Sequence, residues 1–150
     1  MLSRSYLEAV VARHAFVLLA IIIATAGCNP GTAPVIHDVD VARARWLAEP
    51  PSSYVFEESV ATSWVSKFPY FKVTVVSNSI TTIVNEKGAA VPAPWVISID
   101  SLWNRIISER ARGSLNSAVF SEAGVPLEAD WGPWPVDGGV HYYIRNFGRR

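Results

Sequence analysis

Cysteine is almost absent from this chain, because Cys28 is the only one among 150 residues. A single thiol cannot form an intrachain disulfide, and it cannot build the multi-cysteine zinc sites of small metal-binding domains. Histidine is also scarce, and His14, His37 and His141 stand in no metal-binding spacing. The composition therefore predicts neither a metal centre nor a cofactor.

An excess of one charge sign is missing as well. The chain carries 13 Lys and Arg against 13 Asp and Glu, and its one basic cluster is the terminal Arg149-Arg150 pair. Surfaces that bind nucleic acid need concentrated positive charge, so we expect no nucleic-acid partner. The hydrophobic share of 50% is too high for a disordered chain. The length suits one compact domain.

A single long apolar run stands near the N-terminus, over residues 15–26, preceded by Arg4 and Arg13. It is shorter than the ~20 residues needed to span a bilayer. The small residues Thr25-Ala26-Gly27 follow, and Cys28 comes directly after them. This arrangement resembles the bacterial lipoprotein signal, whose cleavage box is an aliphatic residue, a small residue, Gly or Ala, and then Cys. Thr25 departs from the aliphatic position.

This resemblance implies that residues 1–27 are a signal peptide and that Cys28 is lipidated, with a palmitate-type acyl anchor holding the protein at the membrane. A thiolate is a soft nucleophile that suits transfer of a diacylglyceryl group. Asn29, where Asp would favour the inner membrane, indicates the inner leaflet of the outer membrane in a Gram-negative host. An uncleaved membrane helix and an ordinary secretory signal remain the alternatives.

Residues 28–37 are interpreted as the lipidated cysteine and a short tether, because Pro and Gly are concentrated there. Residues 38–150 then form a single domain. Asp38 can cap a helix across Val39–Glu49, and Ser98 can cap a second helix. Apolar residues at helical spacing predict the buried faces, with Val39, Ala42, Trp46 and Leu47 in the first helix and Ile99, Leu102, Trp103, Ile106 and Ile107 in the second.

Alternating and β-branched segments predict six strands, over residues 54–60, 71–75, 80–84, 115–121, 127–131 and 140–147. Short turns separate them within each group of three, which indicates antiparallel pairing. We therefore predict an α+β fold, in which two helices pack on one face of an antiparallel sheet in the order αβββαβββ.

Several segments within residues 40–147 together resemble an uncharacterised family of small bacterial lipoproteins, described as a domain of unknown function, with a helix plus three strands repeated twice. The segments are Trp46, Ser53-Tyr54, 98–103, 119–121, 124–126, Asp130, Asp137 and 140–144. Members often carry a Cys-x-Cys pair where Thr62-Ser63-Trp64-Val65 stands here. The resemblance implies the fold and the envelope location, and it implies no activity.

Two acids and one histidine are candidate reactive groups. Asp130 and Asp137 flank the loop at residues 131–135, where they could perform acid–base chemistry or, with Glu128, bind calcium. We favour a structural role for both in the turn. His141 lies in a predicted strand, and we favour a half-exposed sheet histidine over a catalytic one.

The six tryptophans are the most unusual feature. Trp95, Trp131 and Trp134 lie in or beside proline-rich loops, where they could form rigid platforms for a protein, a peptide or a sugar. The alternative, which we favour, is that they cap the core. Trp46, Trp64 and Trp103 are expected in or near the core.

No nucleophile elbow and no glycine-rich phosphate loop occurs in the sequence, so we expect no enzyme. The leading hypothesis is a non-catalytic envelope module that binds a protein or a small ligand. An inhibitor-like or accessory periplasmic protein is the alternative. A small hydrolase built on His141, Asp130 and Asp137 is the least favoured.

Overall fold

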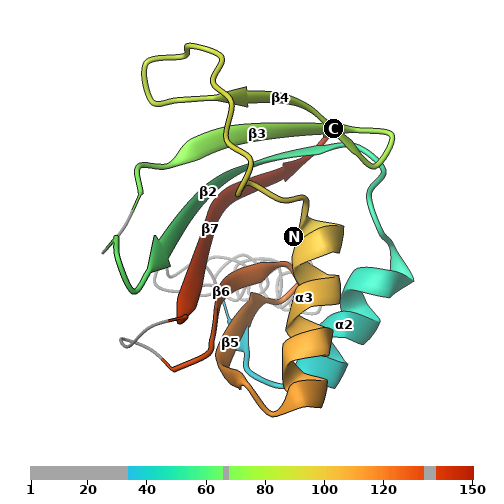
Figure 1. The fold of residues 1–150 in the computed structure, drawn as a ribbon. Helices are drawn as coiled ribbons and strands as arrows, with labels where there is room; N and C mark the ends of the chain where they lie inside the picture. Colours follow the sequence, from blue (N-terminus) through green and yellow to red (C-terminus); the bar gives the residue numbers. More distant parts are fainter. Residues whose placement is uncertain (1–33, 66–67, 134–137) are drawn as a thin grey trace, which may run out of the picture. The chain divides into compact units, whose positions relative to one another are not determined.

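The computed structural model describes residues 34–65, 68–133 and 138–150. Cys28, Trp134 and Asp137 lie outside the described residues. The elements, which Figure 1 labels except for the short β1, are β1 (Val35–Ile36), α2 (Val39–Ala48), β2 (Tyr54–Thr62), β3 (Phe71–Val76), β4 (Ser79–Val84), α3 (Ile99–Arg112), β5 (Leu115–Ser121), β6 (Pro126–Trp131) and β7 (Val140–Arg149).

These strands form one antiparallel sheet of seven strands in the order β1-β5-β6-β7-β2-β3-β4. The last strand, β7, lies between β6 and β2, so it joins the two three-stranded groups along the chain (Figure 1). Glu58 of β2 faces Ile144 of β7, and Tyr142 of β7 faces Ala129 of β6. The central strands are therefore supplied by both halves of the sequence.

The predicted fold class is wrong. The described residues are 42% strand and 22% helix, so the domain is mostly β, and its order begins with a strand. That strand, β1, pairs with β5 through Val35↔Ser121 and Ile36↔Phe120, inside the segment that was predicted to be tether. Two residues are too few to show the alternation on which strand prediction depends. The helices contact mainly β1, β5 and β6 and do not cover the whole sheet.

The positions predicted for both helices and for six of the strands are confirmed to within a few residues. The Asp38 carboxylate accepts from the N–H groups of Asp40 and Val41 at 2.8 and 3.0 Å, which caps α2. Ser98 Oγ accepts from the N–H of Ser101 at 3.2 Å, which caps α3. Gly113, with φ +72°, ends α3 in the left-handed conformation.

The core lies between the helices and the inner face of the curved sheet. Trp103 of α3 stacks on Phe120 of β5 with 4.8 Å between ring centroids. The Asp100 carboxylate accepts from Trp46 Nε1 at 3.1 Å and from the Tyr54 hydroxyl at 3.2 Å. This carboxylate therefore ties α2, β2 and the start of α3 together.

Two predicted core residues are exposed. Leu47 is 57% exposed, because only Ala42 and Trp46 of α2 are buried against the core. Trp64 is 81% exposed, because it lies in the turn after β2 and not in the strand itself. The predictions that placed these two side chains in the core are wrong.

Candidate functional site

A cavity of about 380 Å³ lies between α3, the end of β6 and the start of β7. Its lining residues are Ile97, Ser101, Arg105, Trp131, Val140 and Tyr142. Trp131 and Val140 are paired across β6 and β7, and the Trp131 ring stacks on Tyr142 at 5.2 Å between centroids. The cavity therefore combines a flat aromatic wall with aliphatic side chains and one guanidinium group.

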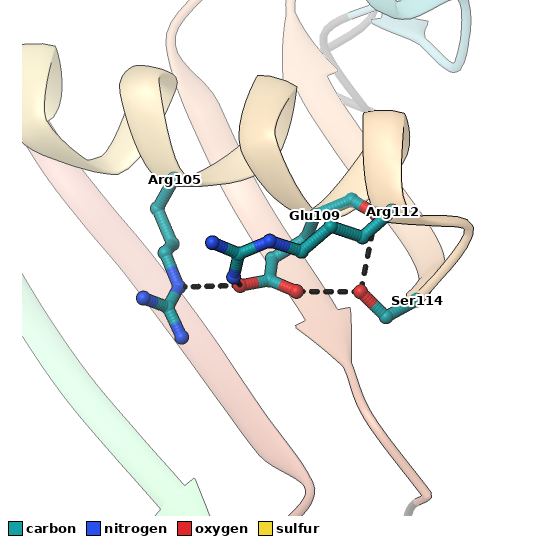
Figure 2. Close-up of polar contacts among 4 residues, drawn as sticks. All are labelled: Arg105, Glu109, Arg112 and Ser114. Atoms are coloured by element: carbon teal, nitrogen blue, oxygen red, sulfur yellow. Dashed lines mark hydrogen bonds and ion pairs between the residues drawn. The ribbon is translucent and has the colours of Figure 1, made fainter.

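Arg105, whose side chain is half exposed, is held at this cavity by an ion pair with the buried Glu109 carboxylate (Figure 2). Its Nε lies 2.8 Å from Oε1 of Glu109, whose residue is only 4% exposed. Arg112 contacts the same oxygen at 3.3 Å, and Ser114 Oγ donates to the other at 2.5 Å. These partners compensate the cost of burying the carboxylate.

The two terminal nitrogens of the Arg105 guanidinium point away from Glu109 in Figure 2. The ion pair uses Nε, so it fixes the plane of the guanidinium and leaves these donors to face other groups. Arginine recognises a carboxylate or phosphate through such a planar fork of parallel donors.

Trp131 packs beside Arg105. The side chain is buried, and within the described residues its Nε1 has no hydrogen-bond partner. This nitrogen is itself inaccessible to solvent, so it faces the core and not the cavity. Arg105 Cζ lies over the Trp131 ring, 5.6 Å from its centre, so the guanidinium is held against the aromatic face.

A buried acid lies behind the cavity. Glu58 is fully buried in β2, and its carboxyl oxygens accept from the Ile97 N–H at 3.3 and 3.4 Å. Burial raises the pKa of Glu58 to about 8, and the Ile97 hydrogen bond lowers it by less. Glu58 is therefore mainly protonated at neutral pH and does not repel an anion in the cavity.

Tyr142 lines the same cavity and donates its hydroxyl to the Trp95 carbonyl oxygen at 3.4 Å. Burial raises the pKa of Tyr142 to about 12, and the nearby Glu58 carboxyl adds to this effect. The phenol therefore stays neutral throughout the physiological range. It contributes a polar edge to the cavity and no charge.

Asp130 and His141 lie across from each other on β6 and β7, on the sheet face opposite the cavity. Ser117 Oγ donates to Asp130 at 2.6 Å, while His141 Nε2 lies 3.5 Å from the Glu128 carboxylate. A serine hydrolase needs its nucleophile bonded to the imidazole. Here the serine is bonded to the aspartate, so the arrangement does not favour the hydrolase hypothesis.

The loop tryptophans behave differently from one another. Trp131 is only 4% exposed at the end of β6, so it belongs to the core and is no surface platform. Trp95 is 38% exposed and stacks on Phe68 at 5.2 Å between ring centroids.

The predictions for Trp134, Asp137 and Cys28 fall outside the described residues. The described ranges hold no group of three or more His, Cys, Asp or Glu side chains suited to a metal ion.

Arg105 and Glu58 were not singled out from the sequence. One signal for Glu58 is present, because it occupies an apolar position in the alternation Tyr54, Phe56, Glu58, Val60. An acid on the buried face of a strand indicates a special environment. No comparable signal marks Arg105, whose neighbours across the cavity come from strands far along the chain.

No family model, curated protein or solved structure matches the chain. The resemblance to uncharacterised lipoproteins therefore stays a prediction. Within the described ranges, no helix has the length and apolar character required to cross a membrane.

Proposed function

We propose that this protein is a lipid-anchored, non-catalytic binding domain of the bacterial cell envelope, exported by its leader and held at the membrane through Cys28. In a Gram-negative host it would face the periplasm from the inner leaflet of the outer membrane. The cleavage box at residues 25–28 supports the anchor. The cavity beside Arg105 supports ligand binding.

The observation that carries the ligand site is the cavity in which the Arg105 guanidinium lies over the Trp131 ring. The two terminal nitrogens of Arg105 can donate together to an acceptor with two oxygens. Ile97 and Val140 supply aliphatic surface next to them, and the Trp131 ring supplies an aromatic wall. The ligand that fits is a small organic carboxylate with a flat apolar body.

Titration with benzoate, phenylacetate and hexanoate, followed by calorimetry, tests this site, with benzamide as the uncharged analogue of benzoate. We expect carboxylates to bind with Kd below about 1 mM and benzamide to bind at least about tenfold more weakly. Failure of all three carboxylates to bind would overturn the site.

One variant tests the donor, and a second is its control. Arg105→Met should weaken benzoate binding by about tenfold or more, because it removes the hydrogen bonds to the charged carboxylate. Arg112→Met should leave affinity within about twofold, since Arg112 also contacts Glu109 but does not line the cavity. If Arg105→Met and Arg112→Met lost equal benzoate affinity, the loss would come from the disturbed Glu109 carboxylate that both contact, and not from a direct contact of Arg105 with the ligand.

A second candidate function is that of an inhibitor-like or accessory protein, and exposed Trp64 favours it. Trp64 lies in a tight turn closed by two backbone hydrogen bonds between Thr62 and Val65, at 2.8 and 3.2 Å. A rigid exposed aromatic is a common anchor at protein interfaces. If this candidate holds, the wild type should crosslink to an envelope protein. Trp64→Ala should abolish this crosslink, and Arg105→Met should leave it unchanged.

A further inference from the structure

Helix α2 has apolar residues on two opposite sides. Ala42 and Trp46 are buried against the core. Four further apolar residues, spaced three to four positions apart, are exposed on the other side, and we call them the outer apolar face of α2: Val41, Ala44, Leu47 and Ala48. Val41 is 45% exposed and Leu47 is 57% exposed. A surface helix of a globular domain normally has a polar outer side.

The acidic residues at the ends of this face are neutralised by ion pairs. Asp40 binds Arg110 through two hydrogen bonds of 2.7 and 2.9 Å. Glu49 lies 3.2 Å from Arg149. These two carboxylates therefore oppose the approach of an anionic surface less than free ones would, while the Asp38 carboxylate accepts from the N–H groups at the start of α2.

The sequence position of α2 limits how far it can lie from the lipid. Six residues separate Cys28 from Val35, and β1 fixes Val35 to the edge of the sheet by pairing it with Ser121. Six residues span at most about 20 Å when fully extended. Helix α2 begins four residues after Val35 and contacts β1. Among the helices of the described residues, it is thus the one nearest to the anchor along the chain.

We infer that the outer apolar face of α2 rests on the surface of the bilayer that holds Cys28 and that this contact orients the domain. The inference rests on the proposed lipid anchor. Two large apolar side chains are too few for a stable protein interface, which buries about 1,200–2,000 Å². They suffice to choose an orientation once the lipid has already concentrated the domain at the membrane.

The test uses the lipidated protein with Leu47→Cys, in which Cys28 sulfur is a thioether and only the new thiol reacts. An environment-sensitive fluorophore is attached at position 47, and the protein is reconstituted in phosphatidylethanolamine–phosphatidylglycerol vesicles with or without a head-group nitroxide lipid. The control carries Thr82→Cys, an exposed position on β4 at the sheet edge opposite β1.

The nitroxide should quench the fluorophore at position 47 at least about twofold more than the one at position 82, because an interfacial helix places its apolar face among the head groups. Adding Val41→Glu, at an exposed site, should remove the difference. Equal quenching at both positions overturns the docking of α2. A mass spectrum without lipid on Cys28 overturns the anchor as well, so the two failures are distinguishable.

Discussion

Glu58 is the residue whose environment departs most from its ordinary chemistry. Its side chain is fully buried in the core, and the Ile97 N–H is the donor that both of its oxygens share. Burial raises its pKa from the ordinary 4.5 to about 8. The folded state thus keeps this proton in a pH range where the unfolded chain has already released it. The free energy of unfolding therefore decreases progressively as pH rises from the lower of these two pKa values to the higher.

We expect stability to fall as pH rises from 5 to 8, by up to about 1.4 kcal/mol per pH unit, and to level off above pH 8. Glu58→Gln should match the wild type near pH 5 and be more stable at pH 8, because it has no proton to lose. Urea unfolding at several pH values measures this difference. Parallel pH profiles for the two proteins would contradict it.

Glu57→Gln is the matched control, because Glu57 is next in sequence but lies on the opposite sheet face. Its hydrogen bond from Arg145, at 2.7 Å, lowers its pKa. A lowered pKa stabilises the fold above the unfolded value, and this contribution is lost as pH falls through the folded pKa. The Glu57→Gln profile should therefore keep the wild-type slope between pH 5 and 8.

At the scale of elements, the contact between α2 and the β5–β6 turn depends on one glycine. Gly124 has φ +77°, and a Cβ placed there would lie 2.2 Å from the Ala42 carbonyl oxygen and 2.8 Å from Trp46 N. Its own carbonyl oxygen accepts from Trp103 Nε1 at 3.2 Å. This turn therefore brings the backbones of α2 and the sheet together, and α3 joins them through Trp103.

Gly124→Ala should destabilise the domain severely, while Gly113→Ala is the control. Gly113 also has a positive φ, of +72°, but nothing lies within 4 Å of its Cβ position. The control should lose about 1 kcal/mol from backbone strain alone, and Gly124→Ala should lose at least about 2 kcal/mol more, from the clash with a helix. Urea unfolding measures the loss of stability in both variants. Similar losses would contradict the prediction, because they would show that α2 moves away from the new Cβ without a further loss of stability.

The helices and strands could largely be predicted from local sequence. Caps at Asp38 and Ser98 and the left-handed stop at Gly113 are local signals that the structure confirms. Helix α2 is the exception, because its apolar residues occupy both sides and periodicity alone cannot say which side is buried. Leu47 was placed in the core for that reason, and the contacts of Trp46 with Tyr54 and Phe147 decide otherwise.

At the scale of the whole molecule, anchoring and binding are assigned to different parts of the chain. The leader and Cys28 are proposed to place the protein, and residues 34–150 form the domain that carries the cavity. Val35 and Ile36, which were predicted to be tether, pair with β5 and belong to the domain. If Cys28 carries the proposed lipid, the remaining short segment would keep the domain close to the membrane.

Cys28→Ala is expected to abolish incorporation of labelled palmitate and to leave the precursor uncleaved, because the thiol that receives the lipid is gone. Metabolic labelling and electrophoretic mobility measure both effects. Asn29→Ala, beside the same cleavage site, is expected to remain lipidated and processed. Unchanged labelling of the Cys28→Ala variant would contradict the lipoprotein proposal.

The sequence by itself determined those features that depend on residues close together in the chain. Capping, turn formation and the alternation of apolar residues are local interactions, so they predicted the bounds of α2, α3 and six strands. The cleavage box before Cys28 is also a local motif. Asp130 and His141 were candidate reactive groups for their residue type and their place in or beside predicted strands. Their contacts with Ser117 and Glu128 depend on strand register.

Only the tertiary structure decided the fold class, the burial of the five tryptophans within the described residues and the candidate site. Pairing of β7 with β2 and β6 brings Trp131, Val140 and Tyr142 opposite Arg105, and the last strand cannot be placed there from local patterns. Trp131 is buried, as the favoured core-cap interpretation expects, whereas Trp64, expected in or near the core, is exposed. Burial is set by which segments close over a side chain. Long-range pairing and close packing are properties of the assembled sheet, and they are absent from any single stretch of residues.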